Sequence, residues 1–199
     1  MNLPPEAEGA SFAGQEVEDE ELEGASFLRC YFRGATLAGV VTRRCSFQAC
    51  DFTLARLNGS EHEGSDFANA VFENANLFGA RFAECRLVGA SFTAATLTGL
   101  IVERGDWSYV TLRGHDLSGA DLRMVRLHEA DLSETNFTDA DLRGADLSHA
   151  QLHNAILAGA DLRDANLDGV DLGEAAFQGA RLDLAGAVQL ARSLGAVVD

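Results

Sequence analysis

Large apolar residues recur at every fifth position along most of the chain. Of the 35 positions that follow this spacing from Phe12 to Leu182, nineteen are Leu and eleven are Phe. Eleven of the twelve Phe residues therefore share one register. A period of five is neither the 3.6 of an α-helix nor the continued 2.0 of a strand, so the chain repeats a short unit of its own.

A second column of small residues precedes each large residue by two positions. It holds nineteen Ala and all four cysteines. Residues at i−2 and i of an extended segment point to the same side, and the residue between them, which is Asp at ten sites, points outward. Gly stands two positions after the large residue in fifteen units, where it permits the turn into the next unit.

This pattern predicts an all-β solenoid, a right-handed quadrilateral β-helix with four five-residue sides and about twenty residues per coil. We expect an N-terminal tail at residues 1–9, the repeat domain at 10–182 and a C-terminal capping segment at 183–199. Nearly nine coils at a ladder spacing of about 4.8 Å would give a rod of about 42 Å.

The periodicity ends at Leu182, and the segment after it has the pattern of a short α-helix. Asp183 is a candidate N-cap, an apolar face follows, and Gly195 is a candidate end. So short a helix is unstable alone and must pack on the last coil, on a partner subunit, or on both. We therefore predict a two-fold dimer through this end. Its expected interface residues are Phe177, Leu182, Leu184, Val188, Leu190, Ala191 and Leu194.

The repeat is irregular between residues 100 and 115, where an unusually large side chain in one column is accompanied by a small one in the other. Trp107 replaces a Leu and is preceded by Gly105, whereas Leu100 in the small column is followed by Val102. A close-packed core requires such exchanges. We expect locally altered corners here and no domain boundary.

Cysteine and histidine positions do not indicate a catalytic or metal site. All four cysteines lie in the small inward column and are interpreted as buried small hydrophobes, although a Cys30–Cys50 disulfide is sterically conceivable. His62 stands in the inward column, and we expect it to pair with backbone groups. A packed solenoid offers no pocket, so we expect no enzymatic activity, no cofactor and no metal.

The charge of the chain bears on the kind of partner that it can bind. There are 31 acidic residues and 15 basic ones, all Arg, for a net charge of −16. This balance argues against nucleic-acid binding and favours a basic protein surface as partner. The absence of a long apolar segment and of a leader-like N-terminus predicts a cytoplasmic protein with no membrane association.

The five-residue repeat resembles the pentapeptide-repeat family over residues 10–182. The end of the chain, from Ala180-Arg181-Leu182-Asp183-Leu184 to Gly195, is similar to the C-terminal cap of the Qnr and MfpA quinolone-resistance proteins. Because no insertion interrupts the repeats, the chain is more similar to MfpA than to Qnr. The resemblance implies a homodimer that binds DNA gyrase, and often topoisomerase IV, as a mimic of duplex DNA, inhibiting the enzyme or protecting it from drugs.

The outward Asp residues are the candidate contacts for such a partner. In twenty-residue coils Asp121, Asp141 and Asp161 stack on one side, and Asp131 and Asp171 lie on another. They would face basic residues of the partner. Alternatively, each hydrogen-bonds its own corner amide and keeps the protein soluble. A scaffolding solenoid that binds an unrelated basic protein is the second hypothesis for the whole chain.

Overall fold

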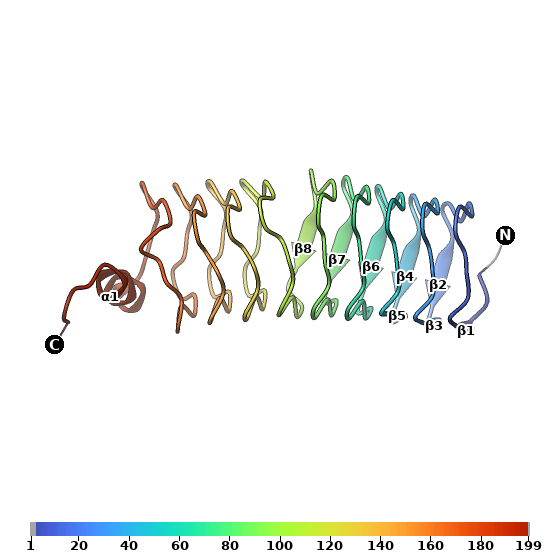
Figure 1. The fold of residues 1–199 in the computed structure, drawn as a ribbon, viewed down its shortest axis with the longest axis horizontal. Coiled ribbons are helices and arrows are strands. Elements are labelled where there is room, and N and C mark those ends of the chain that lie inside the picture. The colour runs from blue at the N-terminus through green and yellow to red at the C-terminus, as the bar shows by residue number, and fades with distance from the viewer. Residues whose placement is uncertain (1–2, 199) are drawn as a thin grey trace. The chain divides into compact units, whose positions relative to one another are not determined.

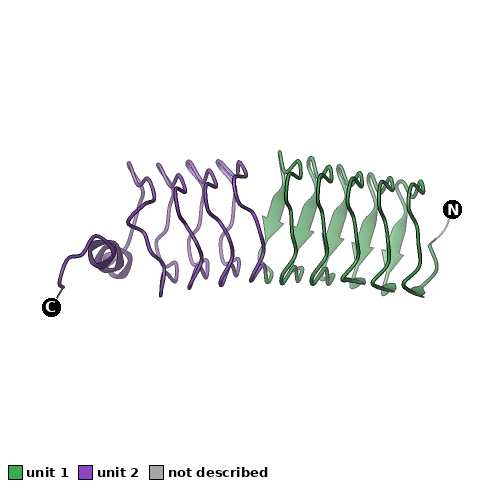
Figure 2. Cartoon of the chain, in the orientation of Figure 1, with its two compact units in different colours: residues 1–106 green, residues 107–199 purple. Residues whose placement is uncertain are grey.

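The computed structural model describes residues 3–198 and forms two compact units that divide between Asp106 and Trp107 (Figure 2). The division falls inside the irregular segment for which we expected altered corners and no boundary. The two units are described separately below, and the bounds 10–182 of the repeat domain stay a prediction.

The first unit is a parallel β-solenoid with two sheets (Figure 1). One sheet has the order β1-β3-β5 and the other β2-β4-β6-β7-β8. Paired strands are offset by twenty residues, as in Glu21 with Val41 and Val41 with Glu61, which confirms four five-residue sides per coil. The strands are β1 (Glu6–Glu8), β2 (Glu21–Glu23), β3 (Ser26–Leu28), β4 (Val41–Arg43), β5 (Ser46–Gln48), β6 (Glu61–Glu63), β7 (Arg81–Ala83) and β8 (Ile101–Glu103).

Strand β1 lies in the segment that the sequence assigned to a tail. Glu6, Ala7 and Glu8 pair in parallel with Ser26, Phe27 and Leu28. Ala7 occupies the large-residue column without being Leu or Phe, and this is why the periodicity did not reveal the first coil. The correction moves the start of the solenoid from residue 10 to residue 6.

Stacked phenylalanine rings fill the core of the first unit. Successive rings in one column lie 4.9–5.0 Å apart with interplanar angles of 6–20°, from Phe12 to Phe92. A second column, of Phe27, Phe47 and Phe67, stacks at 5.0–5.1 Å. Parallel in-register coils place identical side chains directly above one another, so one repeat position generates a continuous aromatic column.

The corners explain why the fifteen glycines are useful but not obligatory. The residue two after the large centre adopts positive φ in all but the units of Leu172 and Leu182, as Gly59 does at +66° and Leu54 at +61°. At many of these corners the amide at i+3 donates to the carbonyl of the centre, as in Ser60 N to Leu57 O at 3.1 Å, which is the pattern of a type II turn. Gly105 is different, because a Cβ there would lie 2.4 Å from the Cys85 carbonyl oxygen. Its small size is therefore required by contact with the backbone of Cys85.

The second unit continues the twenty-residue spacing with isolated bridges and a leucine-rich core. Thr111 pairs with Asp131, and Asp121 pairs with Asp141. Leu132, Leu142, Leu147 and Leu157 are fully buried. The helix α1 (Leu184–Ser193) follows the last coil.

The structure confirms the predicted capping of α1. The Asp183 carboxylate accepts a hydrogen bond from Gly186 N at 2.8 Å, and Gly195 adopts φ +85° just beyond the helix. Gly186 is buried, and a Cβ there would meet Leu182 at 3.0 Å and Leu167 at 3.5 Å. The first turn of α1 therefore packs directly on the coils of the second unit.

Candidate partner-binding surfaces

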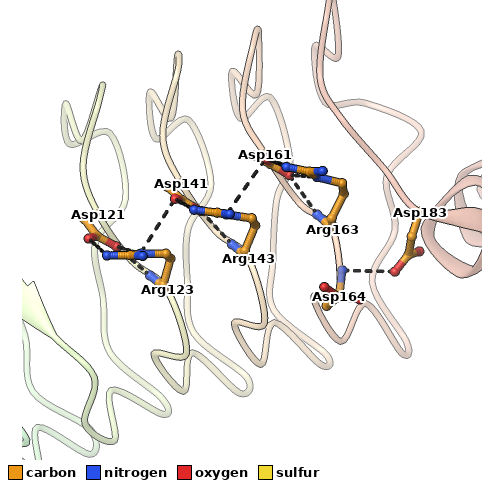
Figure 3. Close-up of polar contacts among 8 residues, drawn as sticks. All are labelled: Asp121, Arg123, Asp141, Arg143, Asp161, Arg163, Asp164 and Asp183. Carbon is orange, nitrogen blue, oxygen red and sulfur yellow. Dashed lines mark hydrogen bonds and ion pairs between the residues drawn. The ribbon is translucent and has the colours of Figure 1, made fainter.

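The structure brings Asp121, Asp141 and Asp161 together in one file, as the sequence predicted. Asp121 pairs with Asp141 and Asp141 with Asp161 as bridge partners in successive coils. All three lie on the same side of the second unit (Figure 3). The file is not a bare acidic surface, however, because an arginine stands beside each carboxylate.

Each of these carboxylates is clamped by the arginine two residues later. Arg143 donates to Asp141 from Nε at 2.9 Å and from a terminal guanidinium nitrogen at 2.6 Å. Arg123 holds Asp121 at 2.8 and 2.6 Å, and Arg163 holds Asp161 at 2.9 and 2.6 Å. We call these six residues the Asp–Arg ladder. Bidentate pairs of this kind are the strongest geometry for an ion pair.

Weaker contacts join successive rungs of the ladder. Arg123 Nε lies 3.7 Å from Asp141, and Arg143 Nε lies 3.9 Å from Asp161. Figure 3 shows the resulting alternation of carboxylate and guanidinium groups. The exposed fraction of the Asp side chain falls from 57% at Asp121 to 16% at Asp161. Positive and negative charges therefore balance locally along this file.

The ladder lowers the pKa values of its carboxyl groups. The hydrogen bonds from Arg163 hold the pKa of Asp161 at about 2, and those from Arg123 and Arg143 lower the pKa of Asp121 and of Asp141. These carboxylates stay ionised at neutral pH, but their charge is used inside the molecule. They attract a basic partner less than three unpaired carboxylates would.

The arginines of the ladder were not identified from the sequence, although a signal was present. Asp-Leu-Arg occurs at residues 121–123, 141–143 and 161–163, one coil apart. Residues i and i+2 of an extended segment share a side, and oppositely charged neighbours on that side pair. The pattern was hidden because the expected chemistry concerned Asp alone.

Asp131 and Asp171 lie in a different file, separated by Gln151. Asp131 accepts the amide of Ser133 at 3.1 Å, and Asp171 accepts the amide of Gly173 at 2.9 Å. Neither forms an ion pair with a described residue. The three ladder carboxylates also accept the amide of residue i+2, at 3.2 Å in each case. All five Asp residues thus make the corner hydrogen bond of the alternative interpretation, and their contact with a partner stays a prediction.

Apolar side chains remain uncovered at the C-terminal end of the second unit. Phe177 and Leu182, the last two large centres, are only half-buried. On α1, Leu184 and Leu194 are 82% and 68% exposed, whereas Val188, Leu190 and Ala191 are half-buried. The residues predicted for a dimer interface therefore lie on one connected segment that keeps accessible apolar surface.

A polar cluster lies inside the first unit, at a place where the repeat calls for apolar side chains. His62 is buried, with Nδ1 2.8 Å from Thr42 Oγ1 and Nε2 3.0 Å from Ser60 Oγ. Its partners are hydroxyl groups and not the backbone groups that we expected. Burial lowers the pKa of His62 to about 3, so the ring is neutral at physiological pH.

The cysteines occupy the small column as predicted, and all four are buried and free. Burial raises the pKa of Cys50 and of Cys85 to about 12. Among residues 3–198, no group of three or more His, Cys, Asp or Glu is placed to hold a metal ion. No helix in the described part of the chain has the length and apolarity to cross a membrane.

Comparison with known proteins gives one family and several solved structures. The family model described as Pentapeptide repeats matches residues 50–82, 75–104, 111–148 and 145–183. A trypsin-treated form of QnrB1, a plasmid-mediated fluoroquinolone resistance protein, is 26% identical, with 98% of this chain and 97% of that chain covered and a TM-score of 0.86. No curated protein matches the chain significantly.

A second relative has a different biological role. HetL from the cyanobacterium Nostoc sp. strain PCC 7120, a pentapeptide repeat protein involved in the regulation of heterocyst differentiation, is 27% identical. The match covers 87% of each chain with a TM-score of 0.51. Together these similarities confirm the predicted class of right-handed quadrilateral β-helix.

Proposed function

The chain belongs to the pentapeptide-repeat family, and from this premise we propose that it binds DNA gyrase, a type II topoisomerase, as a mimic of duplex DNA and protects it from gyrase-targeting antibiotics. The observation that carries the proposal is the likeness to QnrB1 across 98% of the chain. The net charge of −16 supports it, because a DNA-binding surface is basic and attracts an acidic protein. We place the protein in the cytoplasm with its target and extend the proposal to topoisomerase IV.

The geometry ranks the acidic residues that would contact gyrase. Asp131 and Asp171 form no ion pair within 4 Å of a described residue, although Arg113 is close enough to interact electrostatically with Asp131. Their charge is therefore less engaged inside the molecule than that of the ladder carboxylates. Asp121, Asp141 and Asp161 are each held by an arginine of their own coil. In this proposal the Asp131 and Asp171 file supplies more of the attraction, and the ladder supplies less.

We also propose that the protein is a homodimer through its C-terminal end. Burial of Leu184 and Leu194 against a second copy would remove apolar surface from water and cover the half-buried Phe177. Leu194→Glu tests this, because the side chain is exposed and the substitution leaves the packing of the unit intact. Met124→Glu is the matched control, since Met124 is 62% exposed on another part of the same unit. Light scattering should show a monomer for Leu194→Glu and a dimer for Met124→Glu; a dimer for both variants contradicts this interface.

A supercoiling assay with purified gyrase tests the proposed function. The protein at micromolar concentration should inhibit supercoiling, or preserve it in the presence of a fluoroquinolone. If the protein shows neither effect at that concentration, the proposal is contradicted. Two double variants compare the two files, because each removes two negative charges. They are Asp131→Asn/Asp171→Asn and Asp121→Asn/Asp141→Asn. The first pair should weaken the effect by roughly 10-fold and the second by less, because exposed unpaired charges steer binding most.

A second candidate function is a scaffold for another basic protein. The likeness to HetL favours it, since that pentapeptide repeat protein is involved in the regulation of heterocyst differentiation. Under this alternative the protein would leave gyrase activity unchanged with and without the drug. The same assay therefore separates the two functions.

A further inference from the structure

The apolar columns of the repeat do not by themselves fix which coil pairs with which. Because 30 of the 35 large centres are Leu or Phe, a coil shifted by one five-residue side still places apolar residues against apolar residues. Most of the corners also share a positive φ. A solenoid of this kind needs a feature that occurs once and penalises the wrong pairing.

Thr42 and His62 form such a feature in the first unit. They are bridge partners in β4 and β6, and both are large centres that are buried but polar. Thr42 Oγ1 lies 2.8 Å from His62 Nδ1 and 3.1 Å from Ser65 Oγ. Ser60 Oγ lies 3.0 Å from His62 Nε2 and donates to Leu57 O at 2.7 Å, and Ser65 Oγ accepts Cys45 N at 3.1 Å.

Two phenylalanine rings also contact the His62 ring. The His62 ring lies 5.0 Å from the ring of Phe67 and 4.7 Å from that of Phe82. If β4 paired five residues out of its native register, Thr42 would lie opposite Leu57 or Phe67 instead of His62. Neither Leu57 nor Phe67 has a polar side-chain atom. The hydroxyl of Thr42 and the imidazole of His62 would then be buried without partners, and each such loss disfavours the slipped state by roughly 10-fold or more.

We propose that the Thr42–His62–Ser60–Ser65 network is a register key, which selects the native pairing of coils in the first unit. A single buried polar pair has this role in other repetitive folds, where it specifies register at a cost in stability. The network satisfies its own hydrogen bonds only in the native register. The apolar residues that replace it elsewhere in the repeat satisfy their packing in several registers.

The test is refolding of the full chain followed by hydrogen exchange and mass spectrometry. Thr42→Leu/His62→Phe restores the residues that the repeat normally uses. After dilution from urea, the wild type should give one isotopic envelope for peptides that cover residues 41–66. The double variant should give two envelopes, with roughly a tenth or more of the molecules in the less protected one. Phe47→Leu/Phe52→Leu, which changes two apolar centres nearby, should keep one envelope while lowering stability.

Two results overturn the proposal. One envelope for Thr42→Leu/His62→Phe, with full recovery of native protein, shows that the register is set without the network. Because Phe at residue 62 could overpack the core, Thr42→Val/His62→Leu serves as a second variant with smaller side chains. If neither double variant folds, the network contributes stability and not register, and the proposal also fails.

Discussion

Lowering the pH from 7 to 5 should destabilise the first unit through His62. The ring is buried between Phe67 and Phe82, and its pKa falls from 6.5 to about 3 in the folded protein. The unfolded chain therefore binds a proton between these values that the folded chain does not. The stability due to the neutral ring is fully present above pH 6.5 and is lost as the pH falls toward 3. At a rate of about 1.4 kcal/mol per pH unit, the loss at pH 5 is about 2 kcal/mol.

Urea unfolding at the two pH values, followed by circular dichroism, measures this loss. His62→Gln keeps hydrogen-bonding groups near Thr42 and Ser60 but has no proton to bind in this range. It should lose less free energy of unfolding than the wild type between pH 7 and 5, by about 2 kcal/mol. Phe32→Leu changes a buried ring of the same unit that stacks on Phe12 and Phe52. It should be less stable at both pH values and show the wild-type pH dependence. An equal pH dependence for the wild type and His62→Gln would refute the assignment of the effect to this ring.

Three further predictions concern the corners, the helix cap and the ladder. Gly59→Ala should cost about 1 kcal/mol because φ is +66° with open space around the Cα, and thermal denaturation checks it; no change would show that the corner relaxes. Asp183→Ala should cost about 1 kcal/mol through loss of the cap to Gly186, whereas Asp183→Asn should cost less; equal losses would argue against a capping role. Arg143→Gln should raise the pKa of Asp141 toward 3.8, as measured by NMR titration. An unchanged pKa of Asp141 would mean that the pair does not persist in solution. If the pair does persist, the stability that it adds above pH 4 should be lost as the pH drops below that value.

The fold was predictable because its determinants are local and repeated. A large residue at every fifth position and a small residue two before it specify the coil of twenty residues wherever they occur. Asp183 was identified as a helix cap for the same reason, since capping depends on a few adjacent residues. The first coil was missed because Ala7 stands where Leu or Phe would signal the repeat.

The details of the candidate surfaces depended on pairs of residues one coil apart. The charge of Asp141 could be assessed only once Arg123 and Arg143 were known to lie on the same side. His62 was correctly placed inside, but its partners come from another coil and from a different column of the repeat. Periodicity assigns each residue to a column, whereas side-chain pairing between columns depends on rotamers that the period does not specify.

Competition between this protein and DNA for gyrase tests the proposed function most directly. A fluorescent DNA duplex bound to purified gyrase is titrated with the protein at low and at high salt, and release of the duplex is followed by anisotropy. We predict full displacement at micromolar protein, with an affinity that weakens as the salt concentration rises, because the attraction is electrostatic. A duplex that stays bound at every protein concentration at low salt would contradict the account.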